Sequence, residues 1–292
     1  MSSYSLSIIL PAKNESQAIR STLSELRTRF PTAEIIVVDD GSDDGTGSIA
    51  GECGAKVIRH ALSRGNGAAI KSGVRAASGD VLVMMDADGQ HRPGDIPRLL
   101  ERLDEGYDMV VGARDSASQA SIWRGAANRF YNRLATYMTG QVIPDLTSGF
   151  RAVRTDRFRE FLYLLPNGFS YPTTSTMAFF RAGYGVEYVP ISAAKRVGTS
   201  HINLIRDGLR FFLIILKVGT LYSPLKLFVP VAAAEAMLGL GYYAYTYLAQ
   251  GRLSLATIFL LTAGITTFLI GLVSEQITQL LYKDTAQSRV SR

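Results

Sequence analysis

Two aspartates one residue apart follow a short apolar run in the sequence VLVMMDADGQHRP, residues 81–93. Carboxylates this close repel one another unless water or a cation lies between them. If a strand continues through them, Asp86 and Asp88 point to the same side, because side chains alternate along a strand. Two oxygen ligands on one side suit Mg²⁺ or Mn²⁺, and Gln90 can add a neutral oxygen. A D-x-D triplet alone is equally compatible with an ordinary polar strand end.

Two further segments could bind parts of a phosphorylated ligand. In VVDDGSDDGT, residues 37–46, Asp40 could accept a hydrogen bond from a base or a ribose, and Gly41 and Ser42 permit a tight turn. In SRGNGAAIKSG, residues 63–73, a glycine-rich helix start offers backbone N–H groups to phosphate, with Lys71 further along the helix. Each segment also has a simpler explanation, either an acidic turn that caps a helix or a flexible loop.

A sheet is needed to hold these side chains together. Short runs rich in Val and Ile, bounded by turn residues, predict strands over residues 5–12, 34–40, 56–60, 80–88 and 109–114. Helices are predicted between them, the first with an apolar stripe of Ile19, Leu23, Leu26 and Phe30, the others over residues 65–78 and 93–105. The alternation predicts an α/β domain with a mostly parallel sheet and helices on both faces. The acids at 39–40 and 86–88 then lie at the edge where strands end, which is where such sheets bind ligands.

The composition changes near residue 200. The 292-residue chain has a net charge of +6, which suits nucleic acid, anionic lipid or phosphorylated ligands, and a mean hydropathy of +0.12, which indicates a membrane part. Its single cysteine excludes an internal disulfide. The first fifteen residues do not have the pattern of a signal peptide. We therefore expect a globular domain over residues 1–200 and a membrane region after it.

Three segments after residue 200 predict contact with a bilayer. Residues 201–222 place Arg206, Arg210 and Lys217 within one narrow arc of a helix, which predicts an amphipathic interfacial helix or, alternatively, a helix docked on a core. Residues 223–292 contain two apolar runs, about 227–249 and 253–274, each long enough to span a bilayer. We expect Glu235, the one charge in the first run, to face the partner helix or to lie near the interface. Positive charge outside the hairpin tip predicts a cytoplasmic globular domain and tail.

Five ordered motifs resemble one known family. PAKNE at 11–15, VVDDGSDDGT, RGNGAAIKSG, DADGQHRP and DLTSGFRAVR at 145–154 follow the order and spacing of family 2 glycosyltransferases of the dolichol-phosphate mannose synthase type, also called polyprenyl-phosphate glycosyltransferases. The resemblance covers roughly residues 5–210, and the apolar hairpin is similar to that of members with a C-terminal membrane hairpin. It implies a GT-A fold, a UDP- or GDP-linked sugar donor, Mg²⁺ or Mn²⁺, and a polyprenyl phosphate acceptor at the cytoplasmic membrane face.

The resemblance and the residue types together assign site residues. For the nucleotide sugar these are Pro11, Ala12, Lys13, Glu15, Asp40, Gly41, Ser42, Lys71, Asp86, Ala87 and Arg114, with Lys13 where Tyr is frequent. For the metal and diphosphate they are Asp86, Asp88 and Gln90. For the acceptor phosphate they are Arg124, Ser148, Arg151, Arg196 and Ser200, with His201 where Lys is usual. Asp88, Arg124, Arg151, Lys195 and Arg196 are the expected catalytic residues.

The expected reaction needs no general base, because a phosphate monoester acceptor is already ionised near neutral pH. Positioning and charge neutralisation should dominate, and the family implies a single inverting displacement. One alternative is a polysaccharide synthase, but QASIW at 119–123 has Ile122 where those enzymes carry Arg, and few spans follow. Another is a non-catalytic membrane scaffold, which would not need the intact acids. Nucleic-acid binding fits poorly, and the sugar, the nucleotide and the oligomeric state, a homo-oligomer included, stay open.

Overall fold

The computed structural model of the chain describes residues 4–114, 122–168, 170–192, 219–220 and 222–290. The side chains of residues 122–128, Gln250 and 281–290 lie outside the described set. The chain divides into two compact units, Met1–Leu204 and Ile205–Arg292, which we describe separately. The predicted interfacial helix at 201–222 falls almost entirely outside the described residues.

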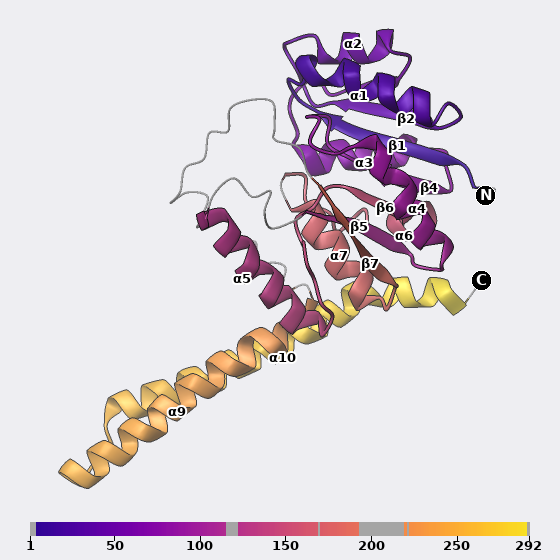
Figure 1. The fold of residues 1–292 in the computed structure, drawn as a ribbon. Helices are drawn as coiled ribbons and strands as arrows, with labels where there is room; N and C mark the ends of the chain where they lie inside the picture. Colours follow the sequence, from indigo (N-terminus) through magenta and orange to yellow (C-terminus); the bar gives the residue numbers. More distant parts are fainter. Residues whose placement is uncertain (1–3, 115–121, 169, 193–218, 221, 291–292) are drawn as a thin grey trace. The chain divides into compact units, whose positions relative to one another are not determined.

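The described strands of the first unit form one seven-stranded sheet in the order β3-β2-β1-β4-β6-β5-β7 (Figure 1). The strands are β1 Leu6–Ala12, β2 Glu34–Asp39, β3 Lys56–Arg59, β4 Val81–Met84, β5 Met109–Arg114, β6 Arg151–Arg154 and β7 Val186–Ile191. All neighbouring pairs are parallel except those that β6 makes with β4 and β5. The prediction of a mostly parallel sheet is therefore confirmed, with β6 as an antiparallel insertion that the periodicity did not predict.

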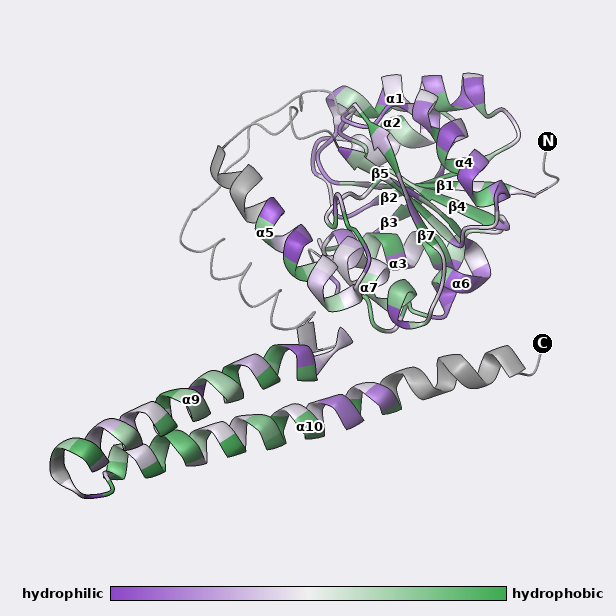
Figure 2. Ribbon diagram, turned by 60° about the horizontal axis from the view of Figure 1, so that its bottom comes forward, coloured by the Kyte–Doolittle hydropathy of each residue, from purple (hydrophilic) through white to green (hydrophobic). Residues whose placement is uncertain are grey.

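Helices cover both faces of this sheet, as predicted. They are α1 Ser16–Arg29, α2 Thr46–Glu52, α3 Asn66–Ala76, the short 3₁₀ helix η1 Pro93–Asp95, α4 Ile96–Asp104, α5 Ile122–Thr139, α6 Thr155–Arg159 and α7 Tyr171–Arg181. Helices α1 and α4 pack their apolar residues on the face that carries Ile8 and Val83. Helix α3 lies against the opposite face, where Gly73 leaves room for the side chain of Ile9 (Figure 2). Alternation of side chains along β1 separates these two cores.

The predicted strand at 80–88 ends earlier than expected, at Met84. Residues 86–91, which we call the carboxylate turn, leave the sheet in a turn. Gly89 adopts a positive φ of 74°, and the Gln90 N–H donates to Asp88 Oδ1 at 3.1 Å. These two local features bend the chain, so no strand continues through Asp86 and Asp88. The condition under which strand geometry would place both side chains on one side is therefore not met.

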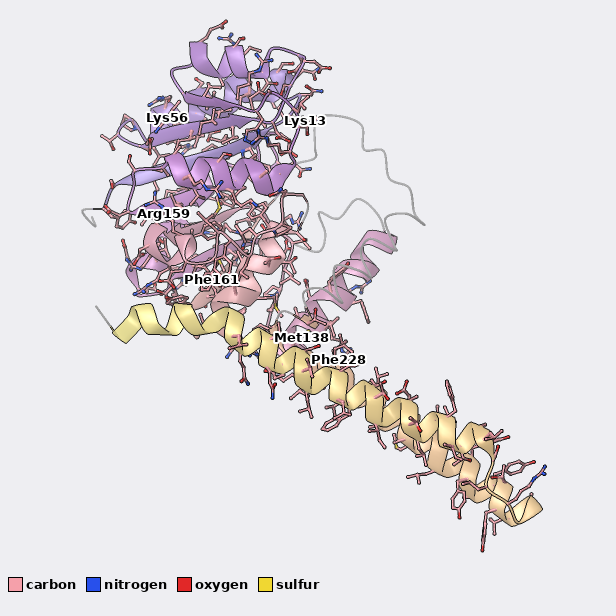
Figure 3. All side chains as sticks on the ribbon, turned by 180° about the vertical axis from the view of Figure 1, so that it is seen from behind. Lys13, Lys56, Met138, Arg159, Phe161 and Phe228 are labelled. Carbon is pink, nitrogen blue, oxygen red and sulfur yellow. The ribbon has the colours of Figure 1, made fainter. Side chains whose placement is uncertain are left out.

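The second unit contains two long helices, α9 Pro224–Gln250 and α10 Leu255–Val290, joined at Gly251 in the left-handed conformation. Residues 224–249 and 255–280 are long and apolar enough to cross a membrane. Small residues let the helices approach: a Cβ on Gly271 would lie 2.7 Å from the Cβ of Phe228 (Figure 3). A Cβ on Gly264 would lie 3.6 Å from that of Glu235, so Glu235 faces the partner helix, as one of the two expected alternatives had it.

Candidate active site

The functional side chains gather where β1, β2 and β4 end, an edge that we call the carboxyl edge. Strand β1 lies between the other two, with Ala12 paired to Asp39 and Ile9 paired to Met84. Asp40 and the carboxylate turn therefore flank the end of β1, which confirms the prediction that both acid pairs share one edge. Arg114 ends β5, and Arg151 begins the antiparallel β6, so both lie at this edge as well.

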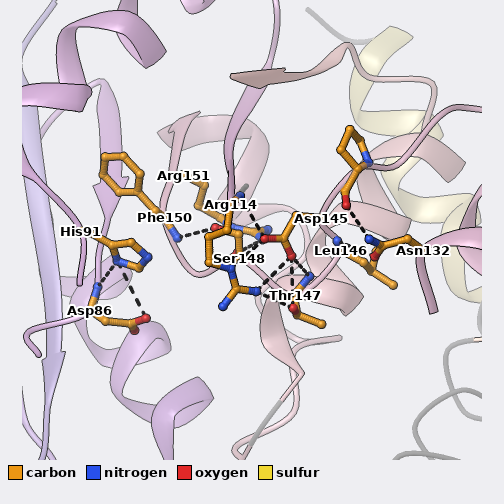
Figure 4. A network of polar contacts seen from close by, with 11 residues as sticks. Asp86, His91, Arg114, Asn132, Asp145, Leu146, Thr147, Ser148, Phe150 and Arg151 are labelled. Atoms are coloured by element: carbon orange, nitrogen blue, oxygen red, sulfur yellow. Dashed lines mark hydrogen bonds and ion pairs between the residues drawn. The ribbon is translucent and has the colours of Figure 1, made fainter. Parts of the chain in front are cut away.

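The carboxylate turn carries the predicted metal ligands. Asp86 is half-buried and Asp88 is 8% exposed. The backbone N–H of Asp86 donates to Nδ1 of His91 at 3.1 Å, which closes the turn (Figure 4). A Cβ on Gly149 would lie 3.2 Å and 3.4 Å from the two carboxylate oxygens of Asp86, so the glycine leaves the space beside this carboxylate open.

These residues fit a divalent ion that arrives with a diphosphate. Among the described residues, no group of three or more His, Cys, Asp and Glu side chains converges on one point. Mg²⁺ in phosphate sites commonly takes one or two carboxylates and completes its shell with phosphate oxygens and water. The pair of Asp86 and Asp88, with the neutral oxygen of Gln90 nearby in sequence, matches that donor set. It does not match a closed structural site, which needs a full set of protein ligands.

A guanidinium is held in place beside these acids. Arg114 Nε donates to Asp145 Oδ2 at 2.7 Å, and Arg114 Nη2 donates to Asp145 Oδ1 at 3.0 Å and to Thr147 Oγ1 at 2.7 Å (Figure 4). Burial lowers the pKa of Arg114, but the bond and charge of Asp145, followed by the charges of Asp86 and Asp88, raise it. Arg114 is therefore a fixed cation in the field of the carboxylate turn. Figure 4 shows the other end of its guanidinium outside this network.

Asp40 has a different environment from the one expected. Its two oxygens accept hydrogen bonds from the Nδ1 of His60, the hydroxyl of Ser63 and the backbone N–H groups of Arg64 and Gly65, at 2.7–2.8 Å. Four donors fill the lone-pair positions of a carboxylate, and the residue is 4% exposed. Asp40 thus anchors residues 63–65, and a contact with a base would require one of these bonds to break.

The glycine-rich start of α3 is also occupied by the chain itself. The N–H groups of Gly67 and Ala68 donate to the carbonyls of Gly168 and Asn167 at 3.1 Å and 2.8 Å. Lys71 donates to the carbonyl of Leu165 at 3.1 Å and to the side chain of Asn167. These donors therefore dock the loop 165–168, and we correct the expectation that they bind phosphate.

Arg151 is fully buried, with 0% of its surface exposed. Its guanidinium donates to the carbonyls of Pro172 and Ser148 and to the hydroxyls of Ser175 and Thr176, all neutral oxygens. Burial lowers the pKa of Arg151. The structure thus contradicts a direct contact of Arg151 with acceptor phosphate in this conformation. The Arg151 side chain instead ties the start of β6 to α7.

The other expected residues are distributed as follows. Pro11 and Ala12 end β1, Lys13 is exposed just beyond it (Figure 3), and Glu15 is tied through its N–H to Thr46 Oγ1 at 2.9 Å. Gly41 turns the chain at a φ of 72°, and the Ser42 hydroxyl accepts from the Asn14 N–H at 3.0 Å. Ala87 and Ser148 are buried. The side chain of Arg124 and all of Lys195, Arg196, Ser200 and His201 lie outside the described residues.

Three functional positions were missed from the sequence: Asp145, His91 and His60. Each of the three lies inside or beside one of the motifs quoted above. Its hydrogen-bond partner, however, is distant in sequence or was assigned another role. Asp145 meets Arg114 across 31 positions, and His60 meets Asp40 across 20. A polar residue next to an assigned motif was the available signal.

Comparison with known sequences and structures gives a consistent result. Residues 7–162 match glycosyl transferase family 2, and residues 223–280 match the GtrB C-terminal hairpin. Glycosyltransferase AglJ of Haloferax volcanii is 31% identical over 252 residues, covering 83% of this chain and 82% of the relative. The undecaprenyl-phosphate mannosyltransferase of Micrococcus luteus is 32% identical over 232 residues, covering 69% and 93%.

Two further similarities are relevant. A dolichyl-phosphate hexose transferase of Haloferax volcanii is 32% identical over 206 residues, covering 70% of this chain and 89% of the relative. The glucosyl-3-phosphoglycerate synthase of Mycobacterium tuberculosis, solved with Mn²⁺, UDP and glucosyl-3-phosphoglycerate, has a TM-score of 0.61 at 22% identity. That likeness covers 74% of this chain and 79% of the synthase, and it concerns the fold.

Proposed function

The chain belongs to glycosyl transferase family 2, and from that premise we propose that it transfers a sugar from a nucleotide sugar to a polyprenyl phosphate. One observation carries the proposal: a carboxylate turn and a fixed arginine share the edge of a GT-A sheet, in a chain that also carries an apolar hairpin. The names of relatives that act on undecaprenyl phosphate and dolichyl phosphate support the same acceptor class.

Asp86, Asp88 and Gln90 are proposed to hold a divalent ion, Mg²⁺ or Mn²⁺. When bound, such an ion would neutralise charge on the departing nucleoside diphosphate. The Mn²⁺ and UDP in the synthase of the same fold support this assignment. The end of β1 and the loops that follow β1 and β2 are proposed to border the nucleotide, through Pro11, Ala12, Lys13, Glu15, Gly41 and Ser42. The choice between UDP and GDP is left to experiment.

Arg114 is proposed to bind a phosphate at the carboxyl edge. Asp145 occupies one side of its guanidinium and fixes the plane of the group. A planar guanidinium that is already oriented loses less freedom when it binds a phosphate than a free side chain does. Because the acceptor is an ionised phosphate, the chain needs to position it and balance its charge rather than remove a proton. Arg124, Ser148, Lys195, Arg196 and Ser200 stay proposed contributors, and inversion at the anomeric carbon stays part of the proposal.

The hairpin of α9 and α10 is proposed to hold the enzyme in the membrane that contains its acceptor. The two apolar segments meet the length of a bilayer core, and their match to the GtrB hairpin supports this role. We further propose that the residues at 201–222 lie in the lipid interface and that the catalytic unit faces the cytoplasm. Both follow from the distribution of basic residues in the sequence.

The test is a panel of UDP- and GDP-linked sugars offered to membranes that contain the full chain and added polyprenyl phosphate. The measured product is a sugar-linked lipid. Asp88→Ala should abolish it while the protein stays folded and membrane-bound, and Glu101→Ala, which removes an exposed carboxylate on α4, should not. Absence of product with every donor would contradict the acceptor class. Unchanged turnover of Asp88→Ala with saturating Mn²⁺ would remove the metal assignment.

A further inference from the structure

His91 is a buried imidazole at the end of the carboxylate turn, and no step of the proposed reaction uses it. It is 4% exposed. Its Nδ1 accepts the backbone N–H of Asp86 at 3.1 Å. A ring nitrogen that accepts carries no proton, so the neutral ring holds its proton on Nε2. The same Nδ1 lies 3.9 Å from Asp86 Oδ2, which is too long for a hydrogen bond.

The bond between the Asp86 N–H and His91 complements a second bond within the carboxylate turn. The Gln90 N–H donates to Asp88 Oδ1, which holds the second carboxylate, and the His91 bond holds the backbone of the first. Two carboxylates that are two positions apart in one turn repel while no cation lies between them. A turn closed at both points keeps the two acids together before an ion arrives, and binding then costs less ordering of the chain.

The flat face of the His91 ring connects the turn to the segment that contains Phe150. The ring stacks on Phe150, with centroids 5.1 Å apart and planes inclined by 17°. Phe150 is fully buried and follows Gly149, whose backbone borders the Asp86 carboxylate. The same segment begins at Asp145, the partner of Arg114. The ring therefore contacts Asp86 in the carboxylate turn and Phe150 in the segment that also carries Asp145.

We propose that His91 is a positioning residue that presets the carboxylate turn for its cation through Nδ1, while its ring packs on Phe150. The proposal rests on the proposed function only for the identity of the cation, since the bond and the stack exist in the chain alone. Nδ1 acts as a hydrogen-bond acceptor and the ring acts as a flat apolar surface, and these two properties can be separated by substitution.

Three variants separate the hydrogen-bond acceptor of His91 from its ring. His91→Asn places an amide oxygen near the position of Nδ1 but removes the ring. His91→Gln carries the same amide one methylene further out, so it serves as the matched control. His91→Phe keeps a ring that can stack on Phe150 but has no acceptor. Each is made in the full chain, and the unfolding temperature shows which variants fold.

The first measurement uses metal-free protein and follows hydrogen exchange of the Asp86 amide. Wild type and His91→Asn should protect it, and His91→Gln and His91→Phe should not. The second measures the affinity for Mn²⁺, alone and with UDP or GDP. The concentration of free Mn²⁺ is followed by electron paramagnetic resonance. Groups that orient metal ligands typically contribute roughly 10-fold to 100-fold in metal affinity. His91→Gln and His91→Phe should therefore bind Mn²⁺ more weakly by that factor. His91→Asn should bind Mn²⁺ with an affinity close to that of wild type.

The outcomes separate this inference from the proposed function. Wild-type protection of the Asp86 amide in His91→Gln and His91→Phe would overturn the inference, whatever the chain binds. Equal Mn²⁺ affinity of His91→Asn and His91→Gln would overturn it too. If the exchange pattern is as expected but wild type binds no Mn²⁺ with either nucleotide, the closure of the turn is upheld and the metal assignment in the proposed function fails.

Discussion

The guanidinium of Arg114 and the carboxylate of Asp145 form a two-point ion pair, with Nε–Oδ2 at 2.7 Å and Nη2–Oδ1 at 3.0 Å. Asp145 is nearly buried, and burial would raise its pKa, but the bonds and charge of Arg114 lower it. The pair links the end of β5 to the segment that precedes β6. It holds one edge of the guanidinium, and the other edge is the one proposed to bind phosphate.

Asp145→Asn should therefore lower turnover through Arg114. The amide cannot accept both N–H donors, so the guanidinium loses its fixed plane. The fold should lose about 1.5–3 kcal/mol, the usual range for hydrogen bonds to charged groups. The check is a double-mutant cycle on kcat/KM with Arg114→Gln. The double variant should lose no more than Arg114→Gln alone. Additive losses would show that Asp145 acts independently of Arg114.

Arg151→Met should affect the stability of the fold and leave substrate binding largely unchanged. The substitution leaves the Ser148 carbonyl without the Arg151 donor in a buried region, which costs about 1–3 kcal/mol for the unsatisfied group. The measurement is the free energy of unfolding, together with KM for the nucleotide sugar and for the lipid at a temperature where the variant is folded. If the variant had wild-type stability and a raised KM for the lipid alone, the result would support direct contact of Arg151 with the acceptor phosphate.

Gly67→Ala should displace the loop 165–168 from α3. A Cβ on Gly67 would overlap the carbonyl oxygen of Pro166, which is backbone and cannot turn aside. We expect a loss of about 2–3 kcal/mol, in the range of overpacked sites. Gly51→Ala is the matched control, because Gly51 lies in α2 with its nearest neighbour 3.9 Å from a Cβ. Alanine should stabilise that helix slightly. Equal unfolding temperatures of the two variants would contradict the close approach.

Asp40→Asn should lower stability in a pH-dependent way. Burial alone would raise the pKa of Asp40, but hydrogen bonds from Arg64, His60, Ser63 and Gly65 lower it to about 2. A carboxyl whose pKa is lower in the folded chain contributes stability above its unfolded pKa, and the contribution is lost as the pH falls through the folded value. The variant should thus be about 2 kcal/mol less stable than wild type at pH 7, a difference that shrinks between about pH 4 and pH 2.

Urea unfolding followed by circular dichroism at several pH values measures this difference. Asp43→Asn provides the control, because Asp43 is exposed and lies in the same acidic run. Its free energy of unfolding should match that of wild type throughout. A constant difference between Asp40→Asn and wild type across the pH range would show that shape rather than charge holds residues 63–65.

The features that the sequence predicted well are those with a local cause. The stripe of Ile19, Leu23 and Leu26 produced α1, and all three residues are fully buried. The Val- and Ile-rich runs produced the strands, and parallel strand order then brought the acids at 39–40 and 86–88 to one edge. Period and turn chemistry are sufficient for such assignments, because each depends on a window of a few residues.

The features that it did not predict depend on distant partners. Nothing near Gly67 shows that residues 165–168 will occupy its N–H groups, and a glycine-rich helix start looks the same whether it binds phosphate or a carbonyl. Arginine is seldom fully buried, so nothing in the sequence around Arg151 indicates that its guanidinium binds neutral oxygens inside the fold. The short β6 lacks the length for a periodic pattern, and its position depends on pairing with β4 and β5.

The antiparallel insertion of β6 also has a consequence for how the molecule is assembled. Strands β1 to β4 can pair in the order of synthesis, since β2 pairs with β1, β3 with β2, and β4 with the free side of β1. By contrast, β5 pairs only with β6 and β7 among the described strands. A chain that stops before Asp145 would also lack β6 and leave the outer side of β4 unpaired, a surface on which strands from other molecules can add. It would carry both aspartates but lack Asp145, Gly149 and Phe150. Catalytic competence therefore appears late in folding, once a strand made well after β4 has taken its place beside it.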